Sequence, residues 1–200
     1  MKLFILISLT AVLFQLQPAY ARKVALVIGH SAYSEGPLRN PVNDARLMEK
    51  TLRPLGFEVK RLENLDYRGM KRAIIDFGNS AKDAEVALVY YAGHGMQQDG
   101  ENWLIPTDAK ISKPADVGLE ALQASSLLHQ LEDSRAKIGL VILDACRNNP
   151  FVSRTRSTSR GLARMDAPSG SIVAYAAQPG AVADDGVGNN GLYTKHLAAN

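Results

Sequence analysis

Cysteine is nearly absent from this protein: the 200-residue chain carries one, Cys146. A single cysteine excludes a disulfide within the chain and a zinc site built from several thiolates. Two roles remain for this residue, an inert packing side chain or a reactive thiol. The residues around Cys146 therefore have to decide between the two.

A large excess of one charge is also missing. The chain has 23 Lys and Arg residues against 20 Asp and Glu residues, which gives a formal net charge of +3. So small an excess argues against a dedicated nucleic-acid surface, and nucleic acid is not expected as a partner. Glycine (16) and proline (9) are too few for a collagen-like or broadly disordered chain, and 46% hydrophobic residues are typical of one globular domain.

The apolar run at the N-terminus is too short to cross a membrane comfortably. It follows a positively charged start, Met1-Lys2, covers residues 3–16 and is followed by Ala19-Tyr20-Ala21. This order predicts a secretory signal peptide over residues 1–21, and a mature domain over residues 22–200 that is exported, periplasmic or secreted. No stable membrane insertion is expected after cleavage. Outside the cytosol a lone thiol has no internal partner, which favours a chemical role.

The rest of the chain alternates predicted strands and helices. Short apolar, β-branched runs predict strands over residues 23–28, 86–91, 138–143 and 171–176, and an alternating pattern predicts an edge-side strand over residues 57–62. Helical spacing of apolar residues predicts helices over residues 41–52, 66–81, 124–131 and 192–199, with Asn40 and Asp66 as N-caps. This alternation predicts an α/β fold with a parallel sheet, in which ligands and reactive groups gather at the carboxyl ends of the strands.

Two predicted strands end in reactive residues. One runs into Ala92-Gly93-His94-Gly95 and another into Asp144-Ala145-Cys146-Arg147. An imidazole can take the proton of a thiol, whose thiolate is the nucleophile. The flanking glycines are expected to let the backbone turn sharply, and the amides of Gly95 and Cys146 would face the oxyanion formed on a carbonyl. We therefore predict a catalytic pair, His94 and Cys146, provided that the two strands are neighbours.

Each of these residues also has a plainer interpretation. Cys146 could be a packing residue, although Asp144 and the polar residues 147–150 are a poor context for a core. His94 could be a structural histidine. His30 also follows a strand and a glycine and is the alternative base, with glycine on one side only. The other two histidines, His129 and His196, are expected at the surface or in packing.

The two motifs, Tyr90-Tyr91-Ala92-Gly93-His94-Gly95 and Asp144-Ala145-Cys146-Arg147-Asn148, resemble the His and Cys motifs of caspase-like cysteine peptidases, nearest the bacterial metacaspase (orthocaspase) branch. Cys146 follows His94 by 52 residues, close to the caspase spacing. The resemblance extends from residue 23 to about residue 197, including residues 41–45 and 191–194.

The resemblance implies a caspase-like three-layer sandwich, with a mostly parallel central sheet and helices on both faces. A large-subunit-like part would reach about residue 150 and a partial small-subunit-like part would cover residues 171–200, where such domains usually continue with another strand. It also implies a thiol protease, a cysteine-type endopeptidase acting on polypeptide substrates. Cys146 would be its nucleophile, His94 its proton carrier, and the amides of Gly95 and Cys146 its oxyanion hole.

The resemblance also implies a substrate preference. Asp144 replaces the glutamine of animal caspases, and in metacaspases an Asp there joins the Asp of an Asn-Asp-Ala motif, here Asp44, to line a pocket for a basic residue. Two carboxylates in a partly desolvated pocket would favour Lys or Arg. Alternatively, Asp44 interacts with a helix dipole and Asp144 pairs with Arg147. Arg39 is the counter-argument, since an arginine in the pocket would select acidic residues. Ala92 departs from the serine that metacaspases often carry.

No metal or other cofactor is expected. Some metacaspases bind calcium through clustered acidic residues, but only Asp108 lies near a matching position and residues 115–123 supply no acidic pair, so calcium dependence is not expected. The Arg- and Ser-rich segment over residues 152–161 is predicted to be a flexible loop. It is either a solvated connection or a site of self-cleavage after Arg154, Arg156 or Arg160.

Three functions therefore stay open from the sequence. The first is an exported cysteine peptidase that cuts after Arg or Lys. The second is a caspase-like binding or scaffold domain with little or no activity. The third is another thiol acyl hydrolase that uses the same pair.

Overall fold

The protein is built around a five-stranded sheet in which every pairing is parallel. The computed structural model describes residues 21–145, 161–177 and 188–200. The strands lie in the order β2-β1-β3-β7-β8. Their bounds are β1 Lys23–Gly29, β2 Phe57–Glu63, β3 Val86–Gly93, β7 Ile138–Ala145 and β8 Ser171–Tyr175. All five were predicted, four from apolar runs and the edge strand β2 from its alternating pattern, and the structure confirms the α/β fold with a parallel sheet.

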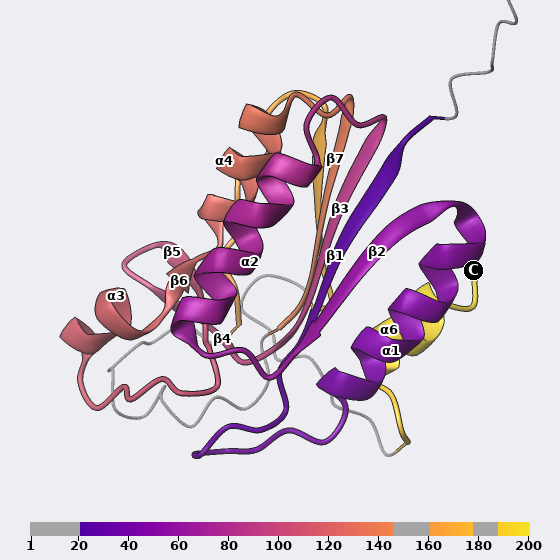
Figure 1. Ribbon diagram of the computed structural model, residues 1–200. Helices are drawn as coiled ribbons and strands as arrows, with labels where there is room; N and C mark the ends of the chain where they lie inside the picture. Colours follow the sequence, from indigo (N-terminus) through magenta and orange to yellow (C-terminus); the bar gives the residue numbers. More distant parts are fainter. Residues whose placement is uncertain (1–20, 146–160, 178–187) are drawn as a thin grey trace, which may run out of the picture.

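Helices cover both faces of this sheet (Figure 1). On one face lie α1 (Pro41–Leu52) and α6 (Leu192–Leu197), and on the other lie α2 (Tyr67–Ser80) and α4 (Ser125–Ser134). The central strands β1, β3 and β7 are apolar on both faces because each face is covered. The result is the predicted three-layer arrangement.

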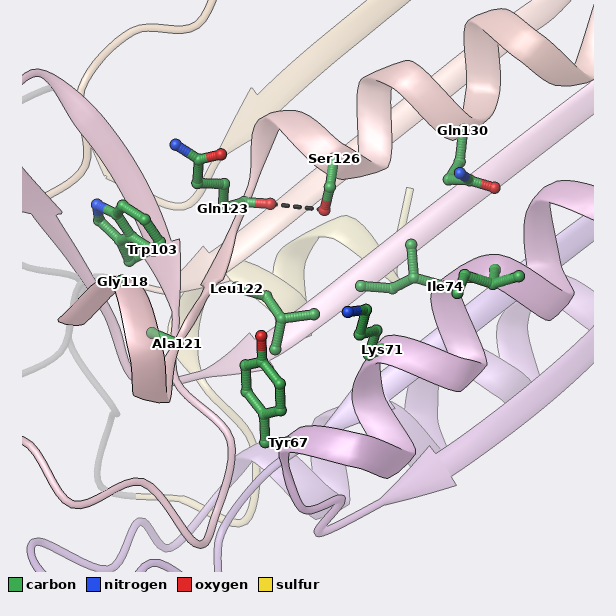
Figure 2. A pocket seen from close by; sticks show the side chains of 11 residues that line it. Tyr67, Lys71, Ile74, Trp103, Gly118, Ala121, Leu122, Gln123, Ser126 and Gln130 are labelled. Carbon is green, nitrogen blue, oxygen red and sulfur yellow. Dashed lines mark hydrogen bonds between the residues drawn. The ribbon is translucent and has the colours of Figure 1, made fainter. Parts of the chain in front are cut away.

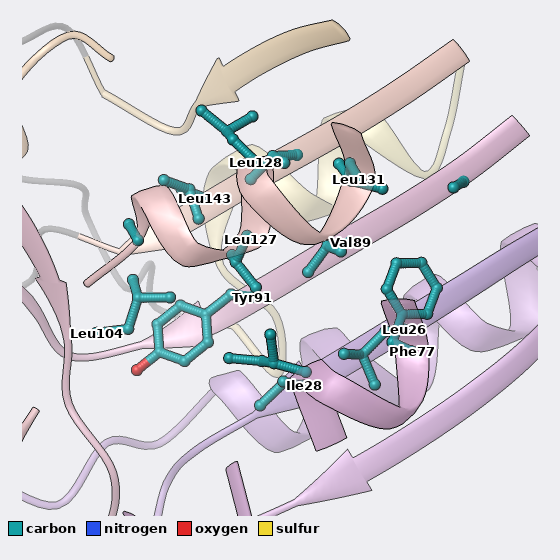
Figure 3. Close-up of a cluster of buried hydrophobic side chains, with 14 of the residues drawn as sticks. Leu26, Ile28, Phe77, Val89, Tyr91, Leu104, Leu127, Leu128, Leu131 and Leu143 are labelled. Atoms are coloured by element: carbon teal, nitrogen blue, oxygen red, sulfur yellow. The ribbon is translucent and has the colours of Figure 1, made fainter. Parts of the chain in front are cut away.

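Two apolar clusters fill the space between the layers. The larger lies under α2 and α4, where Phe77, Leu127 and Leu131 pack against Leu26 and Val89 of the sheet (Figure 3). The other lies under α1 and α6. It contains Ala45, Met48, Leu52, Leu88, Tyr90 and Ile142. Burial of this apolar surface supplies the main driving force for the fold, at about 25 cal/mol per Å².

A second, smaller sheet follows directly after β3, and the sequence did not reveal it. It is antiparallel and has the order β4-β5-β6. Its strands are Gly95–Gln98, Glu101–Leu104 and Leu122–Gln123, and the turn between the first two carries Asp99 and Gly100 at positive φ. Strands of two to four residues are too short to show an alternating pattern. Between β5 and β6 lie a short 3₁₀ turn and α3 (Val117–Glu120).

The predicted helix caps have different outcomes. Asp66 caps α2 as expected, since its carboxylate accepts a hydrogen bond from the amide of Gly69. Asn40 stands at the N-cap position of α1, but its side chain makes no capping hydrogen bond and its backbone is already helical. The prediction of a side-chain cap was therefore wrong for Asn40. The hydroxyl of Ser31 accepts from the amide of Val42 instead, at 3.2 Å.

The edge strand β2 is fixed to α1 by alternating charges. Glu49 of α1 accepts hydrogen bonds from Arg53 and Arg61, and Glu63 contacts Arg46 and Arg61. The hydrogen bond from Arg53, supported by the one from Arg61, lowers the pKa of Glu49 from its usual value. Charged side chains of this kind also protect an edge strand against pairing with another chain.

Several predictions fall on residues outside the described ranges. The signal peptide lies in residues 1–20 apart from its last residue. Cys146 and Arg147 lie in residues 146–160, and so does the predicted loop apart from its last residue, Gly161. These remain predictions. Among the helices of the described ranges, none combines the length and the apolar character that a membrane crossing requires.

Candidate active site

The structure places the two motif-bearing strands next to each other, as the predicted catalytic pair requires. Strand β3 pairs with β7 in parallel, and Gly93 at the end of one is the register partner of Ala145 at the end of the other. His94 follows the first of these residues directly, and Cys146 follows the second. The imidazole belongs to a described residue, whereas the thiol lies just outside the described ranges.

His94 is fully buried and held by a backbone carbonyl that the sequence did not point to. Its Nε2 lies 2.6 Å from the carbonyl oxygen of Gly36, in the segment between β1 and α1. Because a carbonyl only accepts hydrogen bonds, Nε2 carries the proton in this arrangement. In the neutral ring Nδ1 is then the nitrogen that can accept a proton.

Two tyrosine hydroxyls hold the backbone of His94. The amide of His94 donates to the hydroxyl of Tyr33 at 2.9 Å, and the hydroxyl of Tyr91 donates to the carbonyl of His94 at 2.8 Å. Both tyrosine side chains are buried. Tyr33, Gly36 and Tyr91 were missed as site residues, and the one signal for the first two was their position just after the carboxyl end of a strand.

The two residues that flank His94 are glycines because a larger side chain at either position would meet neighbouring atoms. Neither Gly93 nor Gly95 is among the described glycines with positive φ, so neither position requires glycine for a left-handed backbone. A Cβ on Gly93 would lie 2.6 Å from the hydroxyl oxygen of Tyr33 and 2.8 Å from that of Tyr91. A Cβ on Gly95 would lie 3.0 Å from that of Ala145, so Gly95 sits directly beside the residue that precedes Cys146.

His30, the alternative base, lies beneath this network. Its Nδ1 is 3.3 Å from the carbonyl oxygen of Ile105, and among the described residues its buried Nε2 has no hydrogen-bond partner. Burial lowers the pKa of His30 from 6.5 to about 4, against the smaller raising effects of the Ile105 carbonyl and of Asp108. The ring is therefore neutral at pH 7 and packs edge-on against Tyr91.

Asp44 and Asp144, the two carboxylates predicted to line a basic pocket, are both fully buried and both contact the same segment. Asp44 accepts from the side chain of Asn190 at 3.0 Å and from the amide of Gly191 at 2.8 Å. Asp144 accepts from the hydroxyl of Thr194 at 2.6 Å. These contacts hold the start of α6 against the sheet, so the carboxylates have a structural role whatever else they do.

The remaining candidates lie apart from this arrangement. Arg39 is exposed, whereas the two carboxylates are buried. His129 and His196 were expected at the surface or in packing, and both are exposed. Asp108 accepts from the amide of Tyr67 at 2.8 Å and so helps to cap α2.

A groove of about 400 Å³ lies elsewhere, between α2 and the segment formed by α3, β6 and α4 (Figure 2). Tyr67, Lys71 and Ile74 line it on one side, and Trp103 and Leu122 on the other. It contains neither His94 nor the two buried carboxylates, so it is separate from the predicted active site.

Taken together, these features define a class of protein. A parallel sheet sandwiched by helices carries a Gly-His-Gly motif and an Asp-Ala-Cys motif at the ends of two neighbouring strands. The chain belongs to the family defined by the caspase domain, whose model matches residues 22–200. Members of this family are typically cysteine peptidases.

Individual relatives support this assignment. The chain is 31% identical over 132 residues to the human mucosa-associated lymphoid tissue lymphoma translocation protein 1, and the match covers 66% of this chain and 16% of that protein. The mouse homologue matches with the same figures. The chain thus spans less than a fifth of the length of these curated relatives.

Solved structures share the fold. Caspase-1 from Spodoptera frugiperda superposes with a TM-score of 0.66 at 18% identity, over 90% of this chain and 70% of that one. Protein GSU0716 from Geobacter sulfurreducens gives a TM-score of 0.62 at 17% identity, over 89% of this chain and 81% of that one. At these identities the likeness concerns the fold alone.

Proposed function

We propose that this protein is a cysteine endopeptidase with a Cys146–His94 dyad. The observation that carries the proposal is the parallel pairing of β3 with β7. It puts the residues before His94 and Cys146 in register at the carboxyl ends of the two strands. The hydrogen bond between Nε2 and the carbonyl of Gly36 supports it, since it leaves Nδ1 as the proton acceptor.

The proposed reaction has two halves. Nδ1 of His94 takes the thiol proton, and the Cys146 sulfur attacks the carbonyl carbon of the scissile peptide bond. The amides of Gly95 and Cys146 donate to the resulting oxyanion. His94 then gives its proton to the leaving amine, which leaves an acyl-enzyme. Water, deprotonated by His94, attacks the acyl-enzyme and releases the second product and the free thiol.

We further propose that the substrate residue before the cleaved bond is Arg or Lys. The buried carboxylates of Asp44 and Asp144 lie against one short segment of the chain. In this proposal the cation of the substrate replaces donors from Asn190, Gly191 or Thr194. A buried carboxylate gains more from a guanidinium than from a neutral donor. We also propose that the chain belongs to the bacterial metacaspase branch of the family, since Asp144 stands where animal caspases have glutamine.

The test uses the full chain with fluorogenic peptides that end in Arg, Lys or Asp. We expect cleavage after Arg or Lys, and a loss of about 10²-fold or more in kcat for His94→Ala and for Cys146→Ala. His129→Ala is the matched control because its imidazole is exposed, and it should keep wild-type activity. Folded protein that cleaves none of the peptides would overturn the proposal and leave a non-catalytic binding domain or another thiol acyl hydrolase.

The pocket is tested separately with Asp144→Asn, which keeps the shape and one acceptor oxygen but removes the charge. The ratio of kcat/KM for an Arg peptide to that for its citrulline analogue should fall about tenfold or more, since a charge-assisted hydrogen bond is lost. Because both substrates are measured on one variant, a partly unfolded sample leaves the ratio unchanged. Cleavage after Asp by the wild type would overturn the basic pocket.

A further inference from the structure

The segment between β1 and α1 carries a tyrosine that contacts His94 in two independent ways. We infer that Tyr33 is a positioning residue, which fixes the orientation and the tautomer of the His94 imidazole. This inference rests on the proposed function for its effect on catalysis, but its structural part concerns His94 alone. Tyr33 does not contact the substrate in this proposal and transfers no proton, so it acts through His94.

The first contact runs through the hydroxyl of Tyr33. It accepts from the amide of His94 at 2.9 Å and donates to the carbonyl of Ile105 at 3.1 Å. The hydroxyl thus ties the end of β3 to the residue that follows β5. The amide of Ile105 also donates to the carbonyl of His94. His94 is therefore linked to Ile105 directly through its carbonyl, and through the hydroxyl of Tyr33 by its amide.

The second contact runs through the aromatic ring. The ring centroids of Tyr33 and His94 are 4.4 Å apart with an interplanar angle of 56°, so the phenol packs on the imidazole and limits its rotation about χ2. Tyr33 is only 5% exposed, and its ring has little room to move.

Tyr33 also anchors the loop that supplies the carbonyl for Nε2. Gly36 lies three residues after Tyr33 and has a φ of 65°, a left-handed conformation that favours glycine. The start of the loop is fixed because the amides of Ser31 and Ala32 donate to the side chain of Asn64, at 2.8 and 3.0 Å. Without the buried phenol, the loop that carries the Gly36 carbonyl would lose one of the side chains that pack it against the protein.

These contacts predict graded effects of substitution. Tyr33→Phe keeps the ring and loses the hydroxyl, and we expect about a tenfold lower kcat with KM within twofold. Tyr33→Leu loses both, and we expect about a 100-fold lower kcat, the order of loss that misplacing a catalytic group can cause. Phenylalanine at this position therefore restores part of what leucine loses.

The structural part is measured by ¹⁵N NMR of the imidazole rings at neutral pH, with the signals of His94 identified by their absence in His94→Gln. The wild type should show one tautomer with the proton on Nε2, and Tyr33→Leu should show a mixture of both. Tyr175→Phe is the matched control. It removes a hydroxyl that accepts from the amide of Met165 at 2.9 Å, and it should leave the His94 signals unchanged.

The outcomes separate this inference from the proposed function. If the wild type is inactive but the His94 tautomer changes in Tyr33→Leu as expected, the proposed peptidase function is wrong and Tyr33 is still the residue that positions His94. An active wild type whose His94 tautomer and kcat are unchanged in Tyr33→Phe and Tyr33→Leu would overturn the inference and keep the peptidase. Should Tyr33→Leu fail to fold, Tyr33→Phe alone decides: an unchanged kcat overturns the inference, and a lower kcat at constant KM supports it.

Discussion

At the scale of single residues, the imidazole of His94 depends on groups that have no signature in the sequence. Histidine and cysteine stand out because few other side chains carry proton transfer and nucleophilic attack at neutral pH. The Gly36 carbonyl could not be found in this way, since every residue has a carbonyl. Its role depends on the tertiary structure, which brings the carbonyl oxygen of Gly36 to 2.6 Å from Nε2.

His30 gives a prediction at this scale, because it is neutral in the folded protein and exposed to water in the unfolded one. The pKa of His30 is about 4 in the folded protein, below the 6.5 of an ordinary histidine. Between these values the unfolded state binds the proton and the folded state does not, so the free energy of unfolding falls as the pH drops from 6.5 to 4. The gap corresponds to roughly 3 kcal/mol.

Urea denaturation at several pH values measures this effect. In His30→Asn, which keeps a donor for the Ile105 carbonyl, the free energy of unfolding should vary less between pH 6.5 and 4 than in the wild type. His129→Asn is the control, since this exposed histidine should leave the pH dependence unchanged. An identical slope in wild type and His30→Asn would show that burial of His30 does not determine the acid sensitivity.

At the scale of elements, the long parallel strands were predictable and the short antiparallel ones were not. Apolar runs of six or more residues give a clear signal when both faces of a strand are buried. Strands β4, β5 and β6 are defined by their contacts, and one of these contacts reaches across the chain. The buried side chain of Asn102 on β5 donates to the carbonyl of Ala163 at 2.7 Å and accepts from its amide at 2.6 Å.

Asn102→Ala should therefore detach the segment around residue 163 from β5. Both backbone groups of Ala163 would lose these partners, and we expect a loss of about 2 kcal/mol in the free energy of unfolding. Asn79→Ala, at an exposed position of α2, is the control and should cost nothing. Stability within 0.5 kcal/mol of the wild type for Asn102→Ala would mean that the amide does not hold this segment.

At the scale of the whole molecule, α6 closes the fold by contacting residues far away in the sequence. Thr194 is 50 residues from Asp144, and Gly191 is 147 residues from Asp44, yet each pair forms a buried hydrogen bond. Tyr90 of β3 joins the same group, with its hydroxyl 2.5 Å from that of Thr194. One polar cluster thus connects β3, β7, α1 and α6.

Thr194→Val tests this cluster without changing the shape of the side chain. The buried carboxylate of Asp144 would lose a short hydrogen bond, and we expect a loss of about 2 to 3 kcal/mol in thermal or urea unfolding. Thr51→Val is the matched control, because its hydroxyl donates only to Leu47 within α1, and it should cost less than about 1 kcal/mol. Equal losses in the two variants would contradict a special role for the long-range contact.

The amino-acid order by itself determined the class of fold, the five principal strands and the two residues that carry the proposed chemistry. Local patterns suffice for these, since burial on both faces and reactive side chains are properties of short stretches. The tertiary structure alone decided that β3 and β7 are neighbours, that Gly36 and Tyr33 hold His94, and that two distant carboxylates both accept hydrogen bonds from the segment at the start of α6. Such pairings depend on how the layers pack, because contacts between remote segments exist only once the sheet has formed.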